Sequence, residues 1–151
     1  MRFAFRGLPF PRTRMAISRR VLVADDDRDL RAGVCDLLCD WDRFGEWHLD
    51  IVQAESGSAA LEILRGERPR LALLDRHMPG YTGLELVSLV RRETLGVPCI
   101  VLSGDATDAL RSMALHEGAL AVFRKPPEPA LLRAEVSRVL GLSAEHERPR
   151  H

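Results

Sequence analysis

Five short runs of apolar residues alternate with longer segments in which apolar and polar positions follow a helical period. The runs lack the apolar–polar alternation of a half-exposed strand, so we expect strands that are buried on both faces. The segments between them carry apolar residues three and four positions apart, such as Leu30, Val34 and Leu38, which predicts amphipathic helices. The expected strands are 21–24, 48–54, 71–74, 99–102 and 120–123.

Local signals predict where several helices begin and end. Thr82 and Glu85 have the spacing of a capping box, which predicts a helix from there to about Arg92. Glycines and prolines mark other ends, because glycine commonly follows a helix and proline is tolerated in its first turn. The other expected helices are one following the first strand, 58–64 with a stop at Gly66, 105–116 closed by Gly118, and one from the prolines after position 125 to before Gly141.

This regular alternation of strands and helices predicts the fold class. It favours a parallel sheet covered by helices on both faces. Five strand–helix units of this size fit the flavodoxin-like doubly wound α/β fold, with a five-stranded parallel sheet of order 2-1-3-4-5. In such sheets, ligands bind beyond the carboxyl ends of the strands, near the point between strands 1 and 3 where the winding reverses.

Composition narrows the class of protein and its environment. The 151 residues are 46% hydrophobic and 29% charged, with a formal net charge of zero. A binder of nucleic acid or of a membrane surface would favour a basic excess, so we expect neither partner. No apolar run approaches the roughly 18 residues of a membrane span. The three cysteines are expected to be reduced in a cytoplasmic protein.

The chain ends differ from the middle in composition. Residues 1–18 contain several arginines, no acidic residue and two prolines, which predicts a disordered extension or a true start at Met15. Residues 142–151 are polar, and we expect a frayed tail. A single domain is therefore expected at 19–141. An aromatic stretch at 41–47 is interpreted either as a lid on the core or as a docking surface.

Candidate functional side chains follow four of the five expected strands, whereas the second, at the sheet edge, is followed by Glu55 and Ser56. Asp25 and Asp26 come after the first strand, Asp75 after the third, Ser103 after the fourth and Lys125 after the fifth. Parallel strands bring these ends to one edge of the sheet, although the residues are 50 to 100 positions apart. Close carboxylates repel one another, and a hard cation such as Mg²⁺ relieves that repulsion with one or two carboxylates, waters and phosphate oxygens as ligands.

This combination of groups suits phosphoryl transfer. A carboxylate at Asp75 beside a metal ion can attack a phosphoryl group and form an acyl phosphate. Ser103 could donate a hydrogen bond to one phosphoryl oxygen, and Lys125 could pair with another or with Asp75. Lys125 is the only lysine in a chain of 22 basic residues, and lysine is a more compact cation than arginine. Asp27 and Asp29 are expected to cap the first helix instead.

Four segments together resemble the receiver domain of two-component response regulators, of the stand-alone, chemotaxis-regulator-like type. They are VLVADDDRDLR, LALLDRHMPGYTGLEL, CIVLSGDA and GALAVFRKP, and the match extends over about residues 20–140 in order. The resemblance implies that Asp75 is the phosphoacceptor. It implies Mg²⁺ bound directly by Asp26 and Asp75, through water by Asp25, and by the backbone carbonyl of His77. Ser103 and Lys125 would contact the phosphoryl group, with a cis peptide bond between Lys125 and Pro126.

Two positions depart from or complicate this pattern. Receivers usually carry a tyrosine or phenylalanine three residues before the lysine, as the aromatic switch, whereas this chain has Val122 there. Phe123 follows directly, but successive strand residues face opposite sides, so it cannot simply substitute. Asp105, two residues after Ser103, is interpreted either as a helix cap or as a carboxylate that orients water and speeds dephosphorylation.

The function we expect is that of a stand-alone receiver rather than an enzyme. It would accept a phosphoryl group on Asp75 from a sensor histidine kinase or a histidine phosphotransfer protein, and signal to a downstream protein target. The predicted helix 105–116, the strand after it and the last helix form the expected responding surface, through which two copies could also pair. The alternatives are a degenerate receiver that acts as a phosphorylation-independent interaction module, a relay shuttle or phosphate sink, and a phosphohydrolase.

Overall fold

The computed structural model describes residues 19–41 and 49–142. The expectations for residues 1–18, for the aromatic side chains at 41–47 and for the tail from 143 lie outside this part. Strands and helices alternate along the described chain. They are β1 Arg19–Ala24, α2 Arg28–Trp41, β2 Leu49–Ala54, α3 Gly57–Glu67, β3 Leu71–Asp75, α4 Gly83–Arg92, β4 Cys99–Ser103, α5 Asp108–Glu117, β5 Ala121–Arg124 and α6 Pro129–Leu140.

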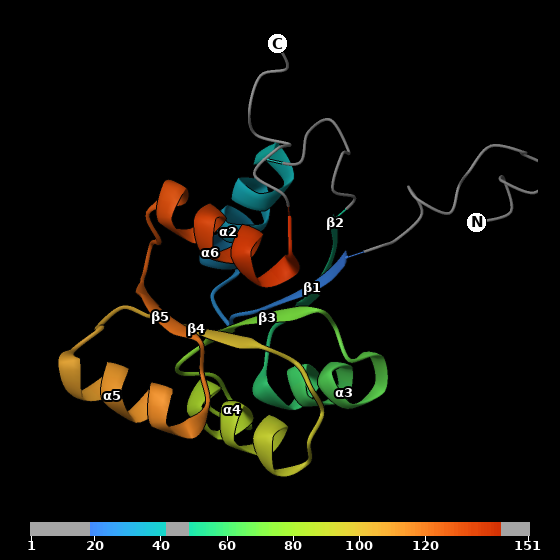
Figure 1. The fold of residues 1–151 in the computed structure, drawn as a ribbon, viewed down its shortest axis with the longest axis vertical. Coiled ribbons are helices and arrows are strands. Elements are labelled where there is room, and N and C mark those ends of the chain that lie inside the picture. Colours follow the sequence, from blue (N-terminus) through green and yellow to red (C-terminus); the bar gives the residue numbers. More distant parts are fainter. Residues whose placement is uncertain (1–18, 42–48, 143–151) are drawn as a thin grey trace, which may run out of the picture.

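The strands form one parallel sheet of order β2-β1-β3-β4-β5 (Figure 1). Strand β1 pairs with β2 on one side and with β3 on the other, so the winding reverses between β1 and β3. Strand β5 pairs with β4 and lies at one edge of the sheet. The predicted flavodoxin-like α/β fold is therefore confirmed.

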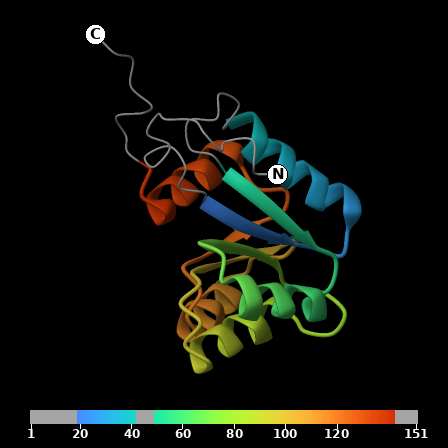
Figure 2. The same ribbon diagram turned by 90° about the vertical axis from the view of Figure 1, so that its right-hand side faces the viewer.

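Helices cover both faces of the sheet, α2 and α6 on one and α3, α4 and α5 on the other (Figures 1 and 2). Alternate strand residues supply the two cores, because successive side chains point to opposite faces. In β1, for example, Val21 and Val23 pack toward α2 and α6, whereas Leu22 and Ala24 pack toward α3 and α4. Every residue of β3 and β4 is buried, as the unbroken apolar runs predicted.

Two helix boundaries differ from the prediction. Helix α3 continues through Gly66 to Glu67, and Arg68 ends it with a left-handed φ of 45°. Helix α5 begins at Asp108, with Thr107 rather than Asp105 as its N-cap. The helix-cap interpretation of Asp105 was wrong because Thr107, nearer the first helical turn, accepts the hydrogen bond from the Leu110 N–H. The capping box of Thr82 and Glu85 is confirmed in both directions.

No helix among residues 19–41 and 49–142 combines the length and the apolar character that a membrane span requires.

Candidate functional site

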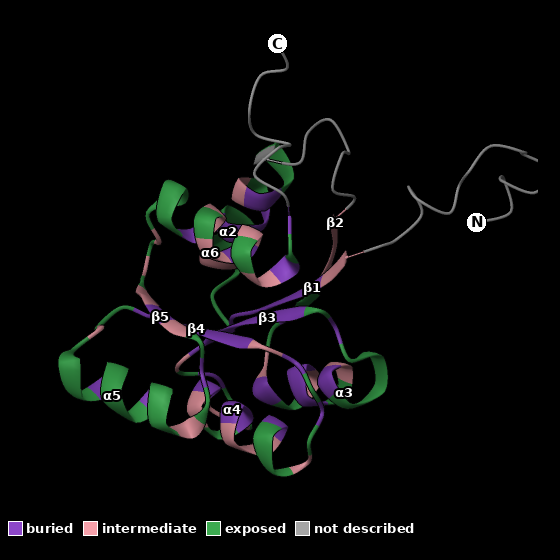
Figure 3. Cartoon of the chain, viewed as in Figure 1, coloured by how far each residue is buried: buried purple, intermediate pink, exposed green. Residues whose placement is uncertain are grey.

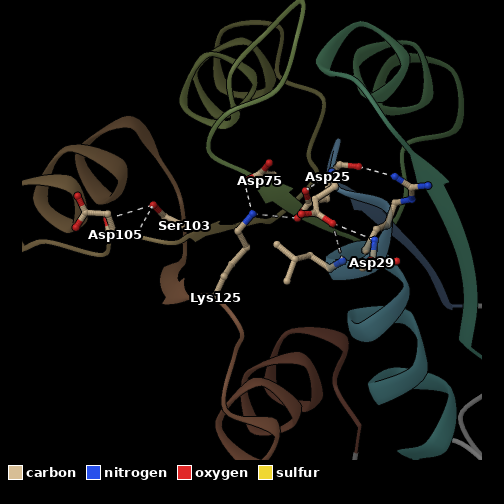
Figure 4. A network of polar contacts seen from close by, with 9 residues as sticks. Asp25, Asp29, Asp75, Ser103, Asp105 and Lys125 are labelled. Atoms are coloured by element: carbon tan, nitrogen blue, oxygen red, sulfur yellow. Dashed lines mark hydrogen bonds and ion pairs between the residues drawn. The ribbon is translucent and has the colours of Figure 1, made fainter.

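A cluster of two buried carboxylates and one half-buried ammonium group lies at the carboxyl ends of the strands. Asp75 is the last residue of β3, and Asp25 follows β1 directly. The Nζ atom of Lys125, which follows β5, lies 2.9 Å from Oδ1 of Asp75 and 3.2 Å from Oδ2 of Asp25 (Figure 4). Asp25 and Asp75 are only 2% and 4% exposed. The strand order has thus joined residues 50 and 100 positions apart, as predicted.

Burial dominates the electrostatics of this cluster. It raises the pKa of Asp75 to about 6, and Asp25 adds to this increase, whereas the hydrogen bond from Lys125 opposes it. Burial alone would lower the pKa of Lys125, but its hydrogen bonds to Asp75 and Asp25 outweigh burial and raise it. Lys125 is therefore held as a cation, while Asp75 is a carboxylate whose charge is only partly compensated.

A third carboxylate completes a group that could hold a divalent cation. One oxygen from each of Asp25, Asp26 and Asp75 lies within 4.8 Å of the others. Asp26 is exposed while the other two are buried, so the group opens to solvent on the side of Asp26. Oxygen donors at this spacing suit Mg²⁺, which retains several waters beside one or two carboxylates. The described residues therefore fit the acidic triad that is typical of a receiver Mg²⁺ site.

The backbone at Asp25 is held from several sides. Its N–H donates to Ala54 O of β2 at 3.0 Å, and its Oδ1 accepts from the Asp27 N–H at 2.8 Å. Asp27 in turn caps α2 by accepting from the amides of Asp29 and Leu30. Arg31 donates to the Asp25 carbonyl at 2.6 Å. We did not predict this contact from the sequence, because the conformation of a long arginine side chain leaves no trace in residue spacing.

The loop after Asp75 is fixed by a close contact with α4. A Cβ atom on Gly83 would lie 2.5 Å from the backbone oxygen of Asp75, a distance so short that real Cβ atoms essentially never show it. The Gly83 N–H also donates to Arg76 O at 3.0 Å. His77, inside this loop, is exposed; the role of its carbonyl as a metal ligand stays a prediction.

Ser103 ends β4 beside Asp75, but its hydroxyl is bonded within its own turn. Ser103 Oγ accepts from the Asp105 N–H at 3.1 Å and donates to Asp105 O at 3.2 Å (Figure 4). The structure therefore brings Asp25, Asp26, Asp75 and Lys125 together and places Ser103 at the same edge of the sheet. The Asp105 side chain is exposed, which leaves its interpretation as a water-orienting group open.

The position of the missing aromatic is filled by a small buried side chain. Val122 is 4% exposed and packs in the core on the side of α3, α4 and α5. Phe123 packs toward the opposite core, which confirms that it faces the other side of the sheet. Arg111 of α5 donates to the carbonyl oxygen of Val122 at 2.7 Å, a contact that the sequence pattern also gave no means to predict. The Lys125–Pro126 peptide bond is cis, as the resemblance implied.

Comparisons with known proteins agree with this geometry. The family model of the response regulator receiver domain matches residues 21–137. PhoB, the phosphate regulon transcriptional regulatory protein of Klebsiella pneumoniae, is 32% identical over 126 residues, which cover 82% of this chain and 52% of that protein. A response regulator receiver protein of Anaeromyxobacter sp. (strain Fw109-5) is 35% identical over 108 residues, 72% of this chain and 43% of that protein. The chain thus spans about half the length, or less, of these curated relatives.

Solved structures show the same fold. The signal receiver domain of the response regulator NarL from Mycobacterium tuberculosis has a TM-score of 0.72 and 30% identity, covering 82% of this chain and 98% of that one. The chemotaxis protein CheY4 of Vibrio cholerae has a TM-score of 0.70 and 26% identity, covering 82% and 99%. Together with the acidic group and Lys125, these matches place the chain in the family of response regulator receiver domains, which are signalling modules rather than enzymes.

Proposed function

We propose that this chain works as a stand-alone receiver that is phosphorylated on Asp75 by the histidine of a sensor kinase or phosphotransfer protein. The observation that carries the proposal is the contact of the half-buried Lys125 with the buried Asp25 and Asp75, in which Lys125 Nζ lies 2.9 Å from Asp75 Oδ1. Ion pairs that serve only stability lie more often at the surface, and placing a half-buried cation against two buried carboxylates costs desolvation free energy. That cost is expected where the groups are needed for chemistry.

The reaction needs little beyond positioning and charge. A carboxylate oxygen of Asp75 attacks the phosphorus atom, a P–O bond forms, and the P–N bond to the donor histidine breaks. The imidazole nitrogen leaves with the bond's electron pair and takes up a proton from solvent. Mg²⁺, held by Asp25, Asp26, Asp75 and the His77 carbonyl, would neutralise charge on the phosphoryl oxygens. Lys125, already within 2.9 Å of Asp75, would turn from the free carboxylate to a phosphoryl oxygen.

The face formed by α5, β5 and α6 is the surface on which we expect a downstream protein target, or a second copy of the chain, to bind. Among the described residues, the exposed large apolar side chains lie on α5, on α6 or in the turn that enters β5. They are Met113, Leu115, Leu120 and Leu131. Partly apolar exposed surface of this kind is typical of protein–protein contact sites. We propose that the protein acts in the cytoplasm, where histidine kinases present their phosphorylated histidine.

A second candidate function is that of a degenerate receiver whose binding does not depend on phosphorylation. It is motivated by Val122, a small buried side chain where receivers usually carry the switch aromatic. The two functions differ in one property, which is whether Asp75 can be phosphorylated.

Incubation with acetyl phosphate and Mg²⁺, followed by intact mass spectrometry, separates the two. We expect the native chain to gain one phosphoryl group and the Asp75→Ala variant to gain none. Asp36→Ala, which removes an exposed aspartate on α2, is the matched control and should behave as the native chain does. If neither acetyl phosphate nor beryllofluoride with Mg²⁺ modifies or binds the native chain, the degenerate module becomes the better account.

A further inference from the structure

One arginine connects helix α5 to the edge of the sheet at the position where the aromatic switch is missing. Arg111 donates from Nη1 to the carbonyl oxygen of Val122 at 2.7 Å, a short and charge-assisted hydrogen bond. The N–H of Lys125 donates to Ser103 O of β4. In a parallel sheet the backbone N–H and C=O groups of alternate residues face the same neighbouring strand. The C=O of Val122, three positions before Lys125, therefore faces away from β4. Arg111 therefore covers a backbone acceptor on the free edge of β5.

Val122 itself is unsuited to changing position. It is 4% exposed, lies in the core beside Leu110 and Ala114 of α5, and is paired with Val101 of β4. A valine has one side-chain torsion and a strong preference for a single rotamer. The strand is thus the fixed partner of this contact, and any movement has to come from Arg111 and the helix that carries it.

The start of α5 follows the Ser103 turn in the chain, and hydrogen bonds hold both the turn and the first turn of the helix. Ser103 holds the turn at Asp105 through its hydroxyl, and Thr107 then caps α5. The backbone N–H of Arg111 donates to Thr107 O at 2.9 Å, so Arg111 lies directly on the first turn. If the Ser103 hydroxyl turns to a phosphoryl oxygen on Asp75, the Asp105 N–H loses its acceptor and the first turn of α5 is free to shift.

The opposite end of α5 is held in place. Arg91 of α4 donates to His116 O at 3.0 Å and pairs with Glu117 at 3.3 Å. Between the two ends, only Leu110 and Ala114 of α5 are buried. A helix that is fixed at its carboxyl end and lightly anchored elsewhere would pivot about the Arg91 contact and move most at its amino end.

We propose that Arg111 takes the place of the aromatic switch: its bond to the Val122 carbonyl is made in the unphosphorylated chain and broken when Asp75 is phosphorylated. This inference rests on the proposed function, because it needs a phosphoryl group that draws Ser103 out of its turn. In this proposal Arg111 of α5 changes its contacts on phosphorylation, whereas Val122 of β5 stays in the core.

Release of Arg111 changes the chemistry of the surface. It leaves one uncovered carbonyl on the edge of β5 and one unpaired guanidinium. Both border a groove of about 460 Å³ that extends from Arg111 past Arg124 to Lys125 and the exposed Leu131. The phosphorylated chain would therefore offer a backbone acceptor and a cation that the resting chain does not.

Nuclear magnetic resonance of the native chain tests the contact without any substitution. The Arg111 Nη1–Hη signals and the Val122 carbonyl carbon are followed before and after addition of beryllofluoride with Mg²⁺. We expect both to shift, and exchange of the Arg111 Hη protons on Nη1 with solvent to become about tenfold faster as the hydrogen bond is lost. Arg65, which pairs with Glu93 between α3 and α4, is the matched control and should not change.

A second measurement uses the Arg111→Gln and Arg111→Lys variants. Both should still bind beryllofluoride, since Arg111 does not touch Asp75. In Arg111→Gln the α5 amide signals should already lie part of the way toward their beryllofluoride-bound positions. Binding by the native chain with unchanged Arg111 and Val122 signals would overturn this inference while leaving the proposed function intact. Failure of the native chain to bind beryllofluoride would overturn the proposed function, and this inference with it.

Discussion

Helices α4 and α5 lie side by side on the same face of the sheet, yet they are anchored very differently. Each begins at a threonine N-cap just after a strand that carries a site residue. Helix α4 buries Gly83, Leu86, Val87 and Val90, and its capping box closes in both directions. Helix α5 buries two residues, its N-cap bond is one-sided, and its outer surface is widely exposed (Figure 3).

This difference suggests separate roles for the two helices, with α4 holding the loop after Asp75 and α5 changing position. Helix α4 fixes the loop that follows Asp75, because Gly83 lies directly against the backbone of that residue. Helix α5 is joined to the site only through the Ser103 turn and to the sheet edge through Arg111. A strongly held helix would keep Asp75, the proposed phosphoacceptor, in a reactive position, whereas a weakly held one can change position when a doubly negative group is added.

The largest effect should come from breaking the α4 contact with a single methyl group. In Gly83→Ala the new Cβ would lie 2.5 Å from the Asp75 oxygen and 3.1 Å from its carbonyl carbon, both backbone atoms that cannot move aside cheaply. We expect the free energy of unfolding to fall by about 3 kcal/mol, measured by urea denaturation, and acetyl phosphate labelling to slow.

Gly33→Ala is the matched control for that substitution. Gly33 lies within α2, and no atom lies within 4 Å of the position of an added Cβ. The same change there should be neutral or stabilising by up to about 1 kcal/mol, because alanine favours a helix more than glycine does. Equal losses in the two variants would show that α4 is not held by close contact with Asp75.

The same contrast explains what could be predicted from the sequence. Strand order, the two-sided burial of β3 and β4, and the meeting of Asp25, Asp75 and Lys125 follow from periodicity and from the geometry of parallel sheets. The capping box of α4 was also predicted, because it depends on residues three positions apart. These features are set by local spacing or by fold topology.

Features that depend on how long side chains are directed in space were not predicted. Arg31 and Arg111 each reach a backbone carbonyl of another element, and no spacing rule selects them from the other arginines. The helix-cap interpretation of Asp105 was wrong, because aspartate and threonine are both good caps and Thr107 is the N-cap in the structure. The loosely anchored helix is thus the part of the fold that sequence predicts least well.

An intermediate effect on the free energy of unfolding should come from Asp75→Asn, which removes the charge of Asp75 and keeps its size. Burial raises the pKa of folded Asp75 to about 6, above the ordinary aspartate value of 3.8, so the folded state holds the proton more tightly than the unfolded state does. The resulting stability is present below pH 4 and is lost as the pH rises through 6. Without divalent cations, Asp75→Asn should lack this loss and gain on the order of 2 kcal/mol over the native chain between pH 4 and pH 7.

Urea denaturation in the presence of EDTA measures this difference at each pH. Because other groups titrate in both proteins, the quantity of interest is the gap between the two stability curves. If the two curves of unfolding free energy against pH stay parallel from pH 4 to pH 7, the charge of Asp75 does not destabilise the folded state. In that case the tight contact of α4 would not be needed to hold an unfavourable charge in place.

The smallest effect compares the two threonine caps directly. Thr82→Ala and Thr107→Ala each remove one acceptor from a helix amino terminus, at a cost of about 1 kcal/mol. In α4 the four buried residues should keep the first turn ordered, so that Thr82→Ala lowers the free energy of global unfolding and does not open the helix locally. In α5, with two buried residues, the first turn should open locally, and its amides should exchange hydrogen faster by roughly tenfold. Hydrogen exchange resolved by residue measures both, and similar patterns in the two helices would mean that α5 is held as firmly as α4 and cannot serve as the moving element.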